Sequence, residues 1–202
     1  SVDIGAGTTD VMIASYKYDD TAKQCNLTPI PLFWESFYKA GDDLLKELIH
    51  QLIVEGKYSP IEKKMKSLNI LPNVIIEKNN DFVGGNTGMS FRNKQLRADF
   101  NLQVSVPIVS YYLELINQNN LESKILSFNE IFGNNLPTQN VLNHFKQHFD
   151  FELESLQWQF ERKVISAIIE KTFDSLIGKI SALFSYYDCD IVLLSGRPTS
   201  LK

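Results

Sequence analysis

The chain has 202 residues, 44% of them apolar, which is enough to bury one substantial core and to form one or two domains. Its 20 basic and 24 acidic residues give a net charge of −4, which argues against general attraction to nucleic acid or acidic lipid. Two cysteines make no disulfide framework, and no apolar run is long enough to span a membrane. We expect a cytoplasmic protein.

The N-terminal part is predicted to hold three strands and a helix. Strands are expected near residues 1–5, 10–18 and 27–37, with prolines limiting regular pairing in the early part of the third. A helix is expected near 42–55, because leucines and isoleucines recur there at helical spacing. Gly56 is a plausible stop for this helix.

The middle of the chain, residues 57–150, is rich in Asn and Gly turns. We predict strands near 74–76 and 102–109, a further strand or sheet edge at 91–100, and a helix at 111–116. We interpret 57–150 as an inserted α+β subdomain.

The C-terminal part is predicted to be helical over 151–186, with a break allowed near Gly178, because a wide apolar stripe runs along it. The apolar run 190–195 is predicted to be a buried strand lying beside the N-terminal hairpin. The pattern is α/β, with a core lobe made of residues 1–56 and 151–202.

The turn between the first two strands carries the clearest chemistry. Gly5, Ala6 and Gly7 allow a ligand to approach the backbone, and successive N–H groups in such a turn form a concavity for anionic oxygens. Thr8 and Thr9 add hydroxyl donors. The alternative is an ordinary Gly-turn hairpin with no ligand.

Two aspartates, Asp3 and Asp10, flank this turn. They would repel a bare phosphate, so their presence indicates a divalent cation or an activated water beside the anion. The chain has neither G-x-x-x-x-G-K-[ST] nor a G-x-G-x-x-G that leads into a helix. The sequence therefore predicts a phosphate-and-magnesium turn within a hairpin.

Three segments carry a resemblance. Residues 2–11 resemble the second phosphate motif, D-[IL]-G-G-G-T-x-D, of the actin, heat-shock chaperone and sugar kinase superfamily, with Ala6 in place of the middle glycine. Residues 190–198 resemble the adenosine motif of that superfamily, with Ser195 in place of a glycine. Residues 38–45 are similar to the turn and helix start that follow the third strand.

The resemblance implies a ribonuclease H-like, actin-type ATPase lobe that binds ATP and magnesium. The turn residues would hold phosphate oxygens. Asp3 would orient the magnesium shell or the attacking water, and Asp10 would support the same shell. Ser195, Gly196 and Arg197 would line the nucleoside. It also implies a first homologous lobe, so we expect the chain to be a fragment that is inactive by itself.

A narrower resemblance rests on two segments taken together, the start of the chain and residues 194–200, Leu-Ser-Gly-Arg-Pro-Thr-Ser. Together they resemble the bacterial SrfB-type virulence factors. This implies a bacterial cytoplasmic protein and leaves secretion as an effector open.

Two functions stay open at this point. The protein either binds ATP between two lobes and hydrolyses it slowly, or it is a non-catalytic scaffold or effector that binds protein partners through the inserted subdomain. Substitution of two motif glycines, by Ala6 and Ser195, favours the second. Retention of both aspartates and both threonines favours the first.

Overall fold

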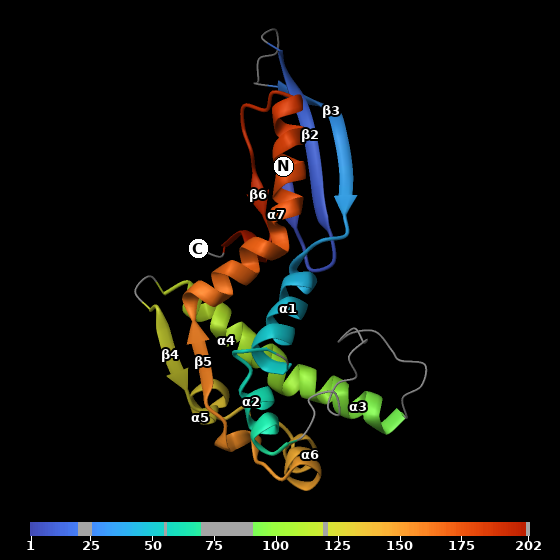
Figure 1. Cartoon of the computed structure of the whole chain (residues 1–202). Helices are drawn as coiled ribbons and strands as arrows, with labels where there is room; N and C mark the ends of the chain where they lie inside the picture. Colours follow the sequence, from blue (N-terminus) through green and yellow to red (C-terminus); the bar gives the residue numbers. More distant parts are fainter. Residues whose placement is uncertain (20–25, 55, 70–90, 119–120, 201–202) are drawn as a thin grey trace. The chain divides into compact units, whose positions relative to one another are not determined.

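The computed structural model describes residues 1–19, 26–54, 56–69, 91–118 and 121–200, and it is mixed α/β (Figure 1). The chain divides into two compact units. Unit 1 comprises residues 1–44 and 169–202, and unit 2 comprises residues 45–168.

Unit 1 is built on a mixed sheet with the strand order β3-β2-β1-β6. Its strands are β1 (Val2–Ile4), β2 (Thr9–Asp19), β3 (Asn26–Phe37) and β6 (Leu194–Ser195). β1 pairs antiparallel with β2, β2 pairs antiparallel with β3, and β6 pairs parallel with β1. The three strands predicted near the N-terminus are confirmed, but the expected limit on pairing in the early part of the third is wrong: Pro29 and Pro31 pair with Tyr16 and Ala14, which an edge strand allows.

One face of this sheet is covered and the other is open. Thr9, Val11 and Ile13 are buried and alternate along β2 with the more exposed Asp10 and Met12. Because successive side chains of a strand point to opposite faces, the buried residues define the covered face.

The C-terminal part of α7 (Arg162–Tyr186) lies along the sheet of unit 1 (Figure 1). In this part of α7, the side chains of Phe173, Leu176 and Ile180 are buried and recur at helical spacing. Just beyond the helix, the Tyr187 ring packs on Phe33, with the ring centroids 5.9 Å apart. This helix therefore supplies the apolar cover of unit 1.

The C-terminal strand differs from expectation. Only Leu194 and Ser195 of the predicted 190–195 pair with β1, and the run is not buried: Leu193 is 65% exposed and Leu194 is 64% exposed. The reason is its place in the sheet, since β6 is an edge strand with no neighbour beyond it in the described residues.

The helix that follows β3 is α1 (Gly41–Ile49), and a π-helical turn, η1 (His50–Val54), continues it. Together they match the helix predicted near 42–55. Asp43 accepts a hydrogen bond from the Ala40 N–H at 2.9 Å, which satisfies an amide at the helix start.

Unit 2 is mostly helical. The remaining helices are α2 (Pro60–Ser67), α3 (Phe91–Phe100), η3 (Asn101–Ser105), α4 (Val106–Ile116), α5 (Phe128–Phe132), α6 (Gln139–Phe149) and η4 (Leu153–Ser155). A two-stranded antiparallel sheet pairs β4 (Ser123–Leu126) with β5 (Trp158–Glu161). Much of its core is aromatic, as in the T-shaped contact of Tyr112 with Phe160.

Two predicted strands of this region are wrong, since both 91–100 and 102–109 are helical. Phe100, Val104 and Ile108 are buried at four-residue intervals, so the run has helical rather than strand periodicity. The helix predicted at 111–116 is confirmed as part of α4. The strand predicted at 74–76 lies outside the described residues.

The long C-terminal helix begins later than predicted. Residues 151–161 hold η4 and β5, α7 starts at Arg162, and Gly178 does not break it. Trp158 and Phe160 are buried and alternate with Gln159 and Glu161, which are half-buried. A two-residue period is typical of a strand. In the sequence this short alternation directly precedes the apolar stripe of α7, so the sequence pattern assigns it to the helix.

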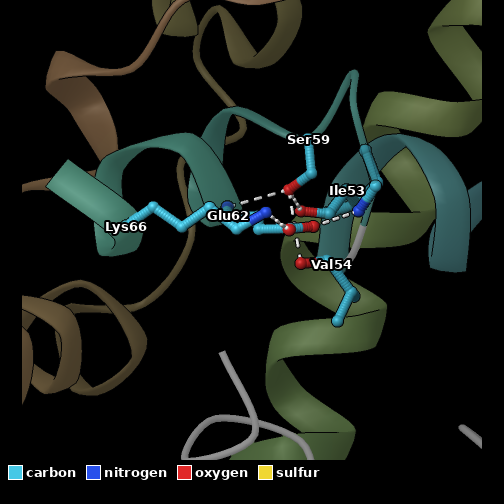
Figure 2. Close-up of polar contacts among 6 residues, drawn as sticks. Ile53, Val54, Ser59, Glu62 and Lys66 are labelled. Atoms are coloured by element: carbon cyan, nitrogen blue, oxygen red, sulfur yellow. Dashed lines mark hydrogen bonds and ion pairs between the residues drawn. The ribbon is translucent and has the colours of Figure 1, made fainter. Parts of the chain in front are cut away.

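A polar network closes the start of α2, and Figure 2 shows its members. The buried Ser59 hydroxyl donates to the Ile53 carbonyl at 2.6 Å and accepts from the Glu62 N–H at 3.0 Å. The Glu62 carboxylate accepts from the Gly56 N–H and pairs with Lys66. The hydrogen bond with Lys66 and then the one from Gly56 hold the pKa of Glu62 below its usual range.

Replacing Glu62 with Gln should lower the free energy of unfolding by about 1 kcal/mol at neutral pH, because a charge-assisted contact is lost and its Lys66 end is exposed to solvent. A carboxyl whose folded pKa is depressed stabilises above its unfolded pKa, and that contribution is lost as the pH falls through the folded pKa. Urea unfolding at several pH values should therefore show the two proteins converging in acid. The exposed Glu114→Gln in α4 is the control, and a difference independent of pH would contradict the role of the charge.

Candidate functional site

The turn between β1 and β2 is a tight hairpin with Ala6 and Gly7 at its tip. The Gly5 N–H donates to the Thr8 carbonyl at 2.9 Å and closes it. None of Gly5, Ala6 and Gly7 has a positive φ. Alanine in place of the motif glycine therefore carries no backbone strain at this position.

The carbonyl groups of the turn are tied to the start of α1. The Gly41 N–H donates to the Gly5 carbonyl at 3.0 Å, and the Asp42 N–H donates to the Ala6 carbonyl at 2.7 Å. In a trans peptide the N–H points away from the C=O, so the amides of Ala6 and Gly7 face away from α1.

These amides are open to a ligand. Within the described part of the chain, the N–H groups of Ala6, Gly7 and Thr8 have no hydrogen-bond acceptor. A Cβ built on Gly7 would meet nothing within 4 Å, so the space beside its backbone is free. Adjacent outward N–H groups of this kind form a concavity that suits anionic oxygens.

The two threonines of the turn lie differently. Thr8 is half-buried, and its hydroxyl is 3.4 Å from Asp10 Oδ2. Thr9 is fully buried on the covered face, and its hydroxyl donates to the Lys39 carbonyl at 2.6 Å. Thr8 thus shares a side with the aspartates, whereas Thr9 fastens the chain segment that precedes α1.

Both aspartates belong to a row of polar residues that crosses the sheet. The strand register places Ser36 opposite Asp10, Asp10 opposite Asp3, and Asp3 opposite Ser195. Directly paired residues project from the same face, so this polar row (Ser36, Asp10, Asp3 and Ser195) stands on the open face beside the turn.

Two hydroxyls bind the carboxylates of the polar row. Ser195 Oγ donates to Asp3 Oδ1 at 2.9 Å, and Ser36 Oγ donates to Asp10 Oδ1. The Oδ1 atom of each aspartate is therefore bound to a serine from an edge strand, Ser195 of β6 or Ser36 of β3.

Gly196 packs against the first strand. Its φ is 96°, and a Cβ built on it would lie 2.0 Å from the Ile4 carbonyl oxygen. Arg197 is exposed and begins the 3₁₀ turn η5 (Arg197–Ser200). A Cβ built on Gly41 would lie 3.5 Å from Pro198 Cγ, so η5, the start of α1 and the turn lie together.

The donor set is compatible with magnesium delivered with a nucleotide. No group of three His, Cys, Asp or Glu side chains able to hold a metal ion occurs among the described residues. Mg²⁺ prefers oxygen ligands and is commonly held by one or two carboxylates together with substrate phosphates and waters. Asp3 and Asp10 meet that requirement beside the open amides.

A family model described as "Virulence factor SrfB" matches residues 1–202. The chain belongs to the SrfB virulence factor family. The narrower sequence resemblance is thereby confirmed, and the chain is a bacterial, virulence-associated protein. Neither the curated proteins nor the solved structures gave a match. No helix in the described part of the SrfB chain is long and apolar enough to cross a membrane.

Sequence reasoning missed one member of the polar row of this SrfB protein. Ser36 lies in the third predicted strand, but its contact with Asp10 depends on the pairing of β2 with β3. A bulge between Ile13 and Ala14 shifts that register farther along the strands. The partner of Asp10 on β3 can be deduced only when one pair of the register is known, such as Thr9 with Phe37, and the sequence does not provide such a pair.

Proposed function

We propose that unit 1 of this SrfB protein binds the phosphates of Mg-ATP at the β1–β2 turn, as the nucleotide-binding lobe of an actin-like or chaperone-like ATPase. One observation carries the proposal: the amides of Ala6 and Gly7 face away from α1 next to two paired carboxylates. Amides alone would suit any anion, but amides beside Asp3 and Asp10 suit an anion that arrives with a cation.

The strand order supports an actin-type, ribonuclease H-like lobe. Three antiparallel strands are followed at the β1 edge by a parallel strand, β6, and α7 covers one face. The adenosine-like segment enters beside β1 through β6. Gly196 and Arg197 then lie at the end of β6 that is nearest the turn, where they would face the nucleoside.

The residues act by positioning and charge. The amides of the turn and the Thr8 hydroxyl would hold phosphate oxygens. Magnesium, when bound, neutralises phosphate charge. Asp3 would orient the cation's water shell or the attacking water, and Asp10 would support the same shell. Catalysis of this type depends mainly on geometry, so turnover would require the first lobe of the superfamily clamp to close the site.

The alternative function is that of a protein-binding scaffold. The open face of the sheet carries Trp34, which is 77% exposed, and Met12, which is 42% exposed. Exposed apolar groups of this size favour an interaction surface. A scaffold would bind partners whether or not Mg-ATP is present, so nucleotide titration discriminates between the two functions.

The direct test is calorimetric titration of Mg-ATP and Mg-ADP into the protein and into the double variant Asp3→Ala/Thr8→Ala. We expect the variant to weaken binding at least tenfold, because a cation-facing carboxylate and a phosphate-facing hydroxyl are both lost. The matched control is Glu35→Ala/Thr28→Ala, which removes the same two chemical groups from exposed positions on β3.

The control should bind like the wild type. A well-folded wild type that binds neither nucleotide would contradict the proposal and favour the scaffold. Equal binding by the wild type and the Asp3/Thr8 variant would place any nucleotide site elsewhere in the chain.

A further inference from the structure

We infer that Ser36 and Ser195 are positioning residues that hold the two carboxylates of the polar row in the orientation required for Mg-ATP. The inference rests on the proposed function and names two residues that act through Asp10 and Asp3. Its basis is the four-strand register, which sets a serine on the outer side of each aspartate.

Each serine binds one oxygen of its neighbour. Ser195 Oγ donates to Asp3 Oδ1 at 2.9 Å, and Ser36 Oγ donates to Asp10 Oδ1. A carboxylate has two oxygens and only accepts hydrogen bonds, so each aspartate keeps a second oxygen for a ligand. Thr8, from the turn, approaches this second oxygen of Asp10 at 3.4 Å.

The carboxylates need this support because they repel each other. Like charges placed directly opposite on neighbouring antiparallel strands are destabilising, and each side chain would otherwise rotate away from the other. Hydrogen bonds from groups that do not themselves bind a metal fix the orientation of its ligands, and their loss typically costs 10- to 100-fold in metal affinity.

This arrangement explains why a serine at position 195 would be useful: its hydroxyl binds Asp3. A glycine at position 195, as in the superfamily motif, could pair with β1 but could not donate a side-chain hydrogen bond to Asp3. Ser36 gives the cleaner test, because it lies outside all three motif-like segments, on the edge strand β3, and is exposed. Removing its hydroxyl should leave the fold intact, since exposed substitutions usually change stability little.

The experiment measures ATP binding by calorimetry over a series of Mg²⁺ concentrations, and in EDTA, for the wild type, Ser36→Ala and Ser36→Thr. For Ser36→Ala we expect the Mg²⁺ concentration that gives half of the full ATP affinity to rise about tenfold, with binding in EDTA unchanged. Ser36→Thr keeps the hydroxyl and should restore the wild-type value. Ser15→Ala, an exposed serine farther along β2, is the control.

The outcomes separate the two claims. Magnesium-dependent binding by the wild type with an unchanged Mg²⁺ requirement in Ser36→Ala would overturn the inference and leave the proposed function standing. Equal weakening in EDTA and in Mg²⁺ would also overturn it, since that is the effect of a merely structural residue. A wild type that binds no ATP would overturn both claims.

Discussion

Replacing Gly196 with Ala is expected to lower the stability of unit 1 by about 3 kcal/mol or more, because two penalties coincide. The φ of 96° is a conformation that residues with a Cβ rarely adopt, and the new Cβ would lie 2.0 Å from the Ile4 carbonyl oxygen. Backbone cannot move aside as a flexible side chain can. β6 would have to part from β1, and the contact of Ser195 with Asp3 would be lost with it.

The matched variant is Gly7→Ala, at the tip of the same site. A Cβ at Gly7 meets nothing within 4 Å, and the φ of Gly7 is not positive, so this protein should keep its fold. Amide hydrogen exchange in β1 and β2 measures the effect on unit 1. Fluorescence of Trp158, which is buried in unit 2, shows whether the rest of the chain is intact when it is measured in a Trp34→Phe background, because Trp34 of unit 1 also fluoresces. Wild-type exchange rates in Gly196→Ala would contradict the packing argument.

The parts of unit 1 that sequence predicts well are those that depend on neighbours along the chain. The hairpin of β1 and β2 follows from apolar runs on either side of a Gly-rich turn, and α1 follows from leucines at helical spacing. The residues at the turn lie near one another for the same reason. Asp3, Thr8 and Asp10 come together because a turn of only four residues, 5–8, joins β1 to β2.

Sequence correctly placed the run 190–195 beside the N-terminal hairpin, but it could not supply the individual side-chain contacts between distant segments. Ser36 meets Asp10 only through the register of β2 with β3, and Ser195 meets Asp3 across almost the whole chain. The hydroxyl of Thr9 looked equivalent to that of Thr8 in the motif. Alternation along β2 places it on the opposite, covered face, where it binds Lys39.

The wrong prediction of a strand at residues 102–109, which are helical, has a different cause. Residues 102–109 contain valine and isoleucine, which are common in strands, and Pro107, which usually disfavours a helix interior. Pro107 lies directly after the π-helical turn η3, inside a helical run that is continuous from α3 to α4, so the wider turn coincides with the position where the proline cannot donate a helical hydrogen bond. The four-residue period of the buried side chains, rather than residue preference, decided the structure.

Arg162, at the start of α7, is the polar residue that fastens β5 and α7 to the end of α4, and its loss should be costly. Its Nε donates to the Leu121 carbonyl at 2.8 Å and its Nη1 to the Ile116 carbonyl at 2.7 Å, while its Nη2 contacts the carbonyls of Leu115 and Gln118. These carbonyls belong to the C-terminal end of α4 and the segment after it, where helical partners run out. The Leu115 and Gln118 carbonyls also accept backbone hydrogen bonds, from the Gln118 N–H at 3.0 Å and the Leu121 N–H at 3.5 Å, so the guanidinium adds a second donor there. The guanidinium also places positive charge at the negative end of the helix.

Arg162→Met should therefore lower the free energy of unfolding of unit 2 by about 3 kcal/mol, because several partly buried carbonyls lose a charged donor. Arg162→Lys should recover less than half of the loss, since an ammonium cannot reproduce the planar fork that reaches four carbonyls. Lys163→Met changes the exposed neighbouring cation and should stay within about 0.5 kcal/mol of the wild type. Urea unfolding followed by Trp158 fluorescence, in a Trp34→Phe background that removes the signal of unit 1, measures all three variants. Wild-type stability in Arg162→Met would show that water replaces the guanidinium without cost.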